Sequence, residues 1–547
     1  MNVKLILDKH RKIIVFIFFT GYLLLGLSIF KDYGISFDEG FHRNDGVLAA
    51  SYINKKIGSL ISTNNLIQNP DELQIENKHH GVIFHLIAAE LEYIFNLKDF
   101  RDIFLMKHVL TFLTFWVSVI FFYFVIVNRF EDWKIGLLGC FFLILSPRIF
   151  AESFYNAKDI IFLSCAIVNI FTLIKFLQYQ DKPFIFIVCH AFSSALLIDI
   201  RIVGVYSPFL TLLFISIELF KSESPKNYIK KMIPVLCTYL SLLTVFLYIF
   251  WPYLWENPIH NFIQSFRTMS KFDWDSYVLY QGSFIKASKL GRNYIPTWIL
   301  ITTPALYTSF FFTGIFYILS DVVKPPFHIY TNKAQKINLV FLSLCLFPLL
   351  AVIFLKSTVY DGWRHLYFIY PSFLLIALTG FVKLIEYAKL NLKGLRYHIF
   401  NSILSISIIY SLISTALFMI TYHPYQNVYF NFIAGKDISK KFELDYWGLS
   451  YKQALEYILT TDQKNKINIA VMNFPGVLNV NFLDQKLRER VNLVPIEQAT
   501  YFLTNYRFRK FPQEYYKFDK KVYPFINEVF AIQIKDYKIM GVYKVGA

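Results

Sequence analysis

The chain has 547 residues, of which 55% are apolar, 19% are aromatic and only 17% are charged, and its mean hydropathy is +0.43. A soluble domain of this size does not carry so much Phe and Tyr with so few charges. Apolar runs long enough to cross a hydrocarbon core of about 30 Å recur along the chain. We therefore expect a polytopic α-helical membrane protein, because a transmembrane β-barrel would show short alternating segments instead.

The formal net charge of +17 would suggest nucleic-acid binding in a soluble protein. Here the basic residues gather in short loops between apolar runs, as the positive-inside bias requires, and this argues against a nucleic-acid partner. The five cysteines all lie in apolar segments and none has a CxxC partner. We interpret them as small core hydrophobes and not as disulfides or metal ligands.

The N-terminal segment is basic up to Lys12 and is followed by a long apolar run. No small-x-small cleavage site precedes Asp32, so we expect a retained first helix and not a signal peptide. The preceding Lys and Arg residues place the N-terminus in the cytoplasm.

Eleven membrane helices follow from the apolar runs, and every loop that their alternation places inside carries at least one Lys or Arg. Two long outer segments interrupt them. The first, 32–103, contains amphipathic helices near 44–55 and 80–95, and the second, 251–297, has the Trp and Tyr content of the headgroup level. The eleven expected helices are 13–31, 104–127, 135–150, 160–177, 184–200, 204–220, 232–250, 298–320, 337–355, 366–384 and 398–420.

The composition changes near residue 421, after which no spanning run occurs. A helix is expected at 451–460 and strands at 467–474, 499–507 and 529–545, the last of them a strand or a hairpin. We therefore expect a transmembrane domain over 1–420 and a small α/β domain over 421–547 on the outer side.

The ionisable residues that stand out lie at the outer ends of helices or in outer loops. A transporter would place several near the midplane, on helices broken by Gly or Pro in two repeated halves, and this pattern instead suits an enzyme at the outer leaflet. These residues are Asp38, Glu39, His42, Arg43, Lys78, His79, His80, Arg148, Asn156, Lys158, Asp159, Asp199, Arg201, Asp361, Arg364 and His365.

The adjacent carboxylates Asp38 and Glu39 follow the first helix. One of them can accept a proton from an acceptor hydroxyl or amine, and its neighbour can bind substrate, a metal or an Arg. The alternative is a solvated carboxylate at a helix end.

Four cations on the outer side, Arg148, Lys158, Arg201 and Arg364, can bind an anionic lipid head and stabilise a phosphate leaving group. Each could also be an ordinary side chain that reaches the headgroups. Asp159 begins a helix, where it either favours the positive helix end or contacts the donor or a metal. His79 and His80, with Glu39 or Asp159, could hold a divalent metal.

Several motifs occur in a fixed order: the Asp-Glu pair after the first helix, PRIFAESFYNAKD at 147–159, the Arg that ends the fifth helix, an aromatic outer segment and YDGWRH at 360–365. With the C-terminal outer domain, this order resembles the GT-C superfamily of integral-membrane glycosyltransferases. It is most similar to glycosyltransferase family 39 and its bacterial relatives, the protein O-mannosyltransferases and the aminoarabinose transferase that modifies lipid A.

The resemblance implies inverting transfer of a sugar from a polyprenyl-phosphate carrier, dolichyl or undecaprenyl phosphate, to an acceptor outside a plasma or bacterial inner membrane. It makes Asp38 the general base and Glu39 its partner. Arg148, Asn156, Lys158 and Asp159 match the loop that holds the donor. Arg364 and His365 match the late basic site near the lipid phosphate.

The chain departs from the family at two points. His79-His80-Gly81 stands where aminoarabinose transferases have a Pro-rich stretch, and 251–297 is too short for the inserted β-trefoil domain of a protein O-mannosyltransferase. The acceptor therefore stays open between protein, lipid and glycan. A flippase of lipid-linked sugars and a non-catalytic membrane scaffold are the alternative functions.

Overall fold

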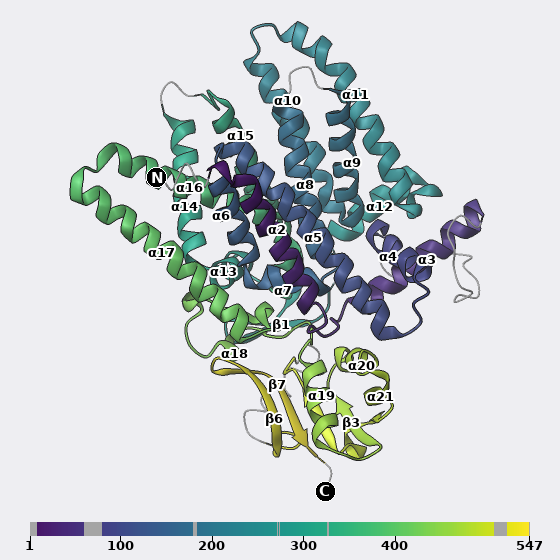
Figure 1. Ribbon diagram of the computed structural model, residues 1–547. Coiled ribbons are helices and arrows are strands. Elements are labelled where there is room, and N and C mark those ends of the chain that lie inside the picture. Colours follow the sequence, from purple (N-terminus) through teal and green to yellow (C-terminus); the bar gives the residue numbers. More distant parts are fainter. Residues whose placement is uncertain are drawn as a thin grey trace.

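The computed structural model describes residues 8–58, 79–178, 183–270, 272, 274–324, 328–507 and 522–545. Lys78 and residues 1–7, which include part of the basic N-terminal segment, lie outside the described residues, as does 59–78 of the long loop. Figure 1 shows helices α2 to α17 gathered in one large layer and strands β3 to β7 below it. The expected class, a polytopic α-helical membrane protein with a small C-terminal α/β region, is confirmed.

Nine helical segments of the described chain are long and apolar enough to cross a membrane, and a bent pair makes a tenth if it counts as one span. The eleventh expected helix is α9 (Phe184–Ile200), which has 17 residues. All eleven expected segments are thus helical. The nine are α2 (Arg11–Ile29), α5 (Phe100–Phe130), α8 (Asp159–Gln178), η1 with α10 (Ile202–Val205, Tyr206–Lys221), α11 (Pro225–Phe250), α14 (Ala305–Val323), α15 (Lys333–Leu355), η4 with α16 (Arg364–Ile369, Tyr370–Asn391) and α17 (Gly394–Thr421).

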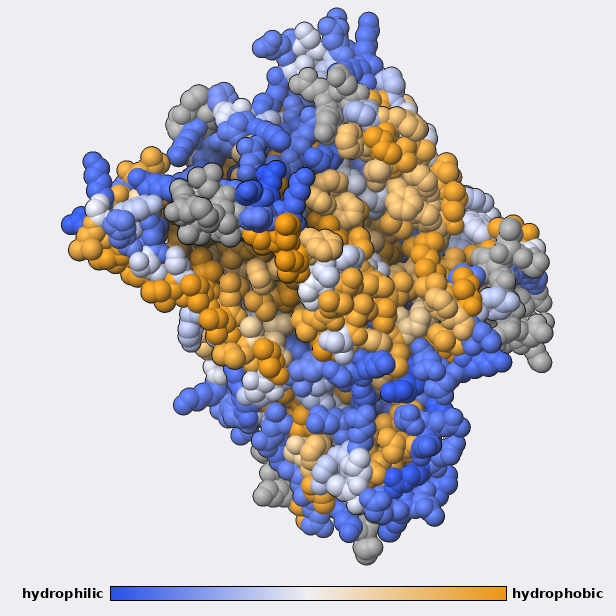
Figure 2. Space-filling view, viewed as in Figure 1, coloured by the Kyte–Doolittle hydropathy of each residue, from blue (hydrophilic) through white to orange (hydrophobic). Residues whose placement is uncertain are grey.

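A hydrophobic band crosses the middle of the face in Figure 2, between two hydrophilic ends. At the periphery, only 17% of the apolar window of α2 and of α17 is buried within the protein, whereas the figure is 78% for α8 and for η4 with α16. The central helices are therefore those that begin at Asp159 and Arg364. Side chains at their ends are held by a packed core.

Two expected segments are wrong in detail, and both errors lie at a proline. The expected helix 135–150 ends earlier, and the segment 147–159, matched to a loop that holds the donor, is mostly the buried helix α7 (Pro147–Tyr155), which lies at 70° to α6 (Trp133–Ile144). Pro147 fits the first turn of a helix, where no N–H is required, but it cannot continue α6. In the same way Pro304 splits the expected helix 298–320 into α13 (Tyr294–Thr302) and α14.

The two long segments between membrane helices contain short elements. The first holds α3 (Glu39–Ile57) and α4 (Ile83–Ile94), which pack on each other. The second holds η2 (Pro252–Trp255), α12 (Pro258–Ser270), the antiparallel hairpin of β1 (Tyr277–Tyr280) and β2 (Ser283–Lys286), and η3 (Ala287–Lys289).

The C-terminal region is a five-stranded mixed sheet in the order β4-β3-β5-β7-β6. The strands β4, β3 and β5 are parallel, whereas β5, β7 and β6 are antiparallel, and β6 and β7 form the expected hairpin. Its elements are η5 (Gln426–Val428), η6 (Phe432–Ala434), α18 (Ile438–Lys441), α19 (Tyr451–Thr461), β3 (Ile467–Val471), α20 (Phe474–Asn481), α21 (Gln485–Arg488), β4 (Val491–Leu493), η7 (Ile496–Gln498), β5 (Tyr501–Thr504), β6 (Glu528–Ile534) and β7 (Tyr537–Lys544).

Candidate active site

A cavity of about 400 Å³ lies where the first residues of α3, α8 and η4 meet the end of α9. We call it the Asp38 cavity. One part of its wall is ionisable: Asp38, His42, His80, Lys158, Arg201, Arg364 and His365. The other part is largely apolar and includes Ile202, Val203, Met269, Phe272, Val352, Leu366 and Phe368. Six of the eleven site residues predicted from the sequence line it. The side chains that do not are Glu39, His79, Arg148, Asn156 and Asp159.

Asp38 and Glu39 point into different surroundings. The Asp38 side chain is 26% exposed, and its Oδ2 accepts a hydrogen bond from Nη1 of Arg364 at 3.1 Å. Glu39 is buried, and its carboxylate accepts hydrogen bonds from the backbone N–H of Ser36 at 2.7 Å and pairs with Nε2 of His108 at 3.0 Å. Asp38 is therefore the member of the pair that a substrate in the cavity can reach.

Arg364 is buried and binds three carboxylates. Its Nη1 lies 3.1 Å from Oδ2 of both Asp38 and Asp159, and its Nη2 lies 3.5 Å from Oδ2 of Asp361. The guanidinium also packs against the Trp447 ring, with 4.7 Å from Cζ to the ring centroid. This planar group is held on several sides, so it is pre-organised before any ligand arrives.

The first turn of α8 is fixed by Asn156. Its Oδ1 accepts the backbone N–H of Asp159 at 2.9 Å, and its Nδ2 donates to Oδ2 of Asp159 at 3.0 Å. Asp159 is buried at this positive helix end and forms ion pairs with Arg201 and Arg364. Its carboxylate thus positions the two arginines of the cavity.

Lys158 differs from the other cations of the cavity. Within the described residues its ammonium group has no hydrogen-bond or ion-pair partner, whereas Arg201 and Arg364 are paired. Burial, together with the nearby Arg201 charge, lowers the pKa of Lys158 to about 8. Lys158 is half-buried, and the charges of Asp38, Asp159 and Asp45 act on it without a direct ion pair, so an anionic ligand in the cavity would give the ammonium group a direct partner.

The histidines of the cavity are neutral. Burial lowers the pKa of both His42 and His80 well below its usual range. His80 is held close to α9 by Gly81, whose N–H donates to the Asp199 carbonyl at 2.6 Å; a side chain at Gly81 would collide with Asp199.

The metal site considered from the sequence does not assemble. His79 faces Ser265, with 3.3 Å from Nδ1 to Oγ, while Glu39 pairs with His108 and Asp159 with two arginines. In the part of the chain that the structure describes, no group of three His, Cys, Asp or Glu side chains could hold a metal ion.

Arg148 lies apart from the Asp38 cavity. Its Nε donates to the Tyr429 carbonyl at 3.2 Å, and its guanidinium lies over the rings of Trp298 and Phe430, at 5.2 and 4.8 Å from the centroids. Its guanidinium group therefore contacts Tyr429, Trp298 and Phe430 and does not line the Asp38 cavity.

Two residues of the network around Arg364 were not among the predicted site residues. Arg507, just after β5, is buried and forms an ion pair with Asp361. Tyr360 lines the cavity beside Arg364, and burial raises its pKa to about 12. Tyr360 stands within the YDGWRH motif and could have been selected, whereas Arg507 is the last residue of the expected strand 499–507, where nothing in the sequence marks it as functional.

No family model matches the sequence, and no curated protein matches it. Among solved structures, the chain is similar to ArnT from Cupriavidus metallidurans bound to undecaprenyl phosphate (10% identity, 97% of this chain and 98% of that chain, TM-score 0.45). It is also similar to the apo oligosaccharyltransferase of Archaeoglobus fulgidus (8% identity, 90% of this chain and 70% of that chain, TM-score 0.45). A third similar structure is the arabinofuranosyltransferase AftD from Mycobacteria (11% identity, 97% of this chain and 41% of that chain, TM-score 0.40). These similarities are distant, and the chemistry of this chain has to be derived from its own residues.

Proposed function

We propose that the protein is an inverting glycosyltransferase that moves a sugar from a polyprenyl-phosphate donor to an acceptor at the membrane face that carries the C-terminal sheet. The observation that carries this proposal is that one cavity contains both the accessible carboxylate of Asp38 and Lys158, a cation with no ion-pair partner among the described residues. The motifs that resemble the GT-C superfamily support the same reaction.

The donor fits the two parts of the cavity wall. The phosphate of the donor would be bound by Lys158, Arg201 and Arg364, which line the cavity together with His365. The cations of one wall suit the charge of a phosphate, and the apolar wall suits the first isoprene units of a lipid carrier.

The reaction is a single displacement at the anomeric carbon. Asp38 accepts the proton of the acceptor hydroxyl or amine as the acceptor oxygen or nitrogen bonds to that carbon. The bond from the anomeric carbon to the phosphate oxygen breaks, and polyprenyl phosphate leaves with the electron pair. The cations stabilise the charge that develops on the phosphate, and each such contact contributes about 3–4 kcal/mol in a pre-organised site.

Glu39, Asn156 and Asp159 act as positioning residues. Glu39 fixes the start of α3, and hence Asp38, through Ser36 and His108. Asn156 and Asp159 fix the start of α8, and hence Lys158 and the paired arginines.

The test is the substitution Asp38→Asn, which keeps the shape of the side chain and removes the base. We expect the rate of sugar transfer to fall by about 10²–10⁴-fold, the usual contribution of a general base. Transfer is measured as radiolabelled sugar that passes from polyprenyl-phosphate donors to acceptors in membranes containing each variant.

The matched control is Asp102→Asn, which removes an exposed carboxylate from the first turn of α5 and should leave transfer unchanged. Near-normal turnover by the Asp38→Asn protein, at equal expression, would exclude Asp38 as the base and with it the proposed mechanism.

A further inference from the structure

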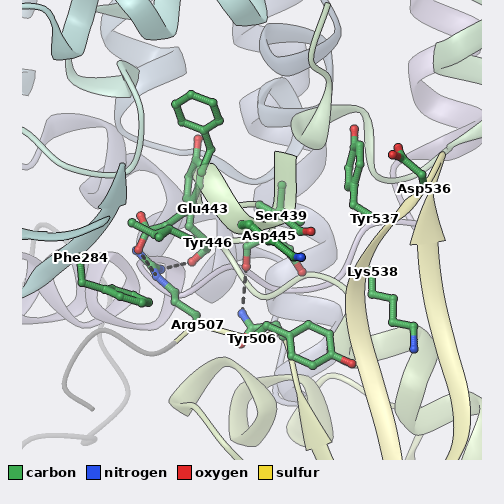
Figure 3. Close-up of a pocket in the computed structure, with 15 residues that line it drawn as sticks. Phe284, Ser439, Glu443, Asp445, Tyr446, Tyr506, Arg507, Asp536, Tyr537 and Lys538 are labelled. Carbon is green, nitrogen blue, oxygen red and sulfur yellow. Dashed lines mark hydrogen bonds and ion pairs between the residues drawn. The ribbon is translucent and has the colours of Figure 1, made fainter. Parts of the chain in front are cut away.

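A second cavity, of about 230 Å³, lies between the β1–β2 hairpin, the segment around α18 and the β6–β7 turn. We call it the Glu443 cavity. In Figure 3, Glu443, Tyr446 and Arg507 lie together at one end, whereas Asp536, Tyr537 and Lys538 lie at the other. It is smaller than the cavities of about 300–1,000 Å³ that hold drug-sized ligands, so it is sized for a small chemical unit.

Polar atoms at one end of this cavity lack partners. The Glu443 side chain is 8% exposed, and within the described chain its Oε2 has no hydrogen-bond partner. Nε of Arg507 also lacks a hydrogen bond there, and its nearest carboxylate oxygen is Oε1 of Glu443 at 4.0 Å. Buried polar atoms are rarely left unpaired, so this end is built to receive hydrogen bonds from a ligand.

The rest of the wall selects a neutral ligand with both apolar and hydroxyl surfaces. Three basic side chains and three acidic ones line the cavity, so neither kind dominates: Lys440, Arg507 and Lys538, and Glu443, Asp445 and Asp536. Burial raises the pKa of Glu443, which favours its neutral form. Aromatic rings line the remaining wall: Phe284, Phe442, Tyr446, Tyr506 and Tyr537.

Sugars match this wall because they combine C–H faces, which pack on aromatic rings, with hydroxyl groups. Each hydroxyl both donates and accepts, so one sugar can satisfy a carboxyl oxygen and a guanidinium nitrogen at once. An extended peptide fits less well. It would add to the edge strand β6 through main-chain hydrogen bonds, whereas this cavity is lined largely by side chains near the β6–β7 turn.

The Glu443 cavity adjoins the proposed active site. Asp361 forms ion pairs with both Arg364, in the wall of the Asp38 cavity, and Arg507, in the wall of the Glu443 cavity. The two cavities therefore lie on either side of one chain of charged groups. A molecule bound in the second cavity would therefore be linked to the Asp38 cavity through Arg507, Asp361 and Arg364.

We propose that the Glu443 cavity binds a carbohydrate unit, and that this unit is the glycan part of the acceptor. The assignment of this unit to the acceptor rests on the proposed function. Carbohydrate binding does not, because it can be measured without any transfer.

The experiment uses the full chain in detergent and follows the binding of short neutral gluco- and manno-oligosaccharides by saturation-transfer NMR and titration calorimetry. We expect binding by the wild-type protein, and about tenfold weaker binding by Glu443→Ala, which loses a hydrogen bond. Phe284→Ala, at the half-buried wall of the hairpin, should weaken binding by a similar factor.

Two further variants serve as controls. Glu497→Ala removes an exposed carboxylate from η7, outside the cavity, and should bind like wild type, as should Asp38→Asn. Oligosaccharide binding that is absent, or that survives both Glu443→Ala and Phe284→Ala, overturns the proposal, and so does binding of unglycosylated peptides in place of sugars. Normal transfer by Asp38→Asn would instead remove the proposed function and leave the binding result standing.

Discussion

Lys158 is the cation whose environment says most about the substrate. Its side chain is half-buried near Arg201, and it lacks a direct ion pair with any carboxylate in the described residues. A bound phosphate would supply the direct anionic partner that the described side chains do not.

The pKa of Lys158, about 8, leads to a pH prediction. Lys158 is charged below this pH and neutral above it, whereas a phosphate monoester is already doubly ionised above pH 7. Affinity for undecaprenyl phosphate should therefore fall as pH rises from 7 to 9. Lys158→Met should weaken binding about 10- to 100-fold at pH 7, the value of a charge-assisted hydrogen bond, and should abolish the pH dependence.

Lys158→Arg is the matched control for that experiment because its charge persists at pH 9. It should retain affinity at the alkaline end, where the wild-type protein loses it. An affinity that is flat between pH 7 and 9 in the wild-type protein would contradict the role of Lys158. Binding is measured by titration with the lipid in mixed micelles.

At the scale of elements, α3 is tied to α5 through Glu39. The Glu39 carboxylate pairs with His108 of α5, and the Glu39 carbonyl accepts a hydrogen bond from Nζ of Lys107 at 3.3 Å. Glu39→Gln should lower the free energy of unfolding by about 1–3 kcal/mol, because it weakens a buried hydrogen-bonded pair. The transfer rate should fall far less than in Asp38→Asn.

For Glu39→Gln, two quantities are measured on the purified protein: the midpoint of thermal unfolding and the rate of sugar transfer. A loss of activity as large as that of Asp38→Asn, with an unchanged midpoint, would show that Glu39 takes part in the reaction and does not merely position α3.

The elements of this chain are predictable to different degrees, for physical reasons. Apolar length fixes the membrane helices, because the bilayer requires it. The helix after Pro147 was not expected because Arg148, Glu152 and Ser153 interrupt its apolar residues, although the fold buries all of α7. Adjacent carboxylates at the start of a helix point about 100° apart, so the pattern could find the pair Asp38 and Glu39 but could not tell which one faces the cavity.

At the scale of the whole molecule, the C-terminal sheet completes the site. Arg507 reaches Asp361 across 146 positions of sequence, and Asp361 in turn holds Arg364. A local sequence pattern cannot predict a contact of this kind. Arg364 could therefore be predicted from the sequence, whereas Arg507, which positions it through Asp361, could not. The C-terminal sheet is therefore part of the charge network and not an independent appendage.

This coupling can be tested with two arginines of the C-terminal region, each of which binds a carboxylate of the helical layer. Arg507 is 7% exposed and pairs with Asp361, whereas Arg488 is 26% exposed and pairs with Asp99 at 2.8 Å. Arg507→Gln removes one of the two buried arginines that pair with Asp361. Breaking a buried pair typically costs about 3–5 kcal/mol, and the alignment of Arg364 changes. Arg488→Gln breaks a pair near the surface, which contributes only about 0–1 kcal/mol.

We therefore expect Arg507→Gln to lower kcat for transfer at least about tenfold, while the KM for the lipid donor changes little, because Lys158 and Arg201 still bind the phosphate. Arg488→Gln should leave both constants near wild type. The measurement is steady-state transfer by protein of equal purity that elutes as a single species in gel filtration. Equal activity of the two variants would mean that the C-terminal sheet does not act on the site through Asp361.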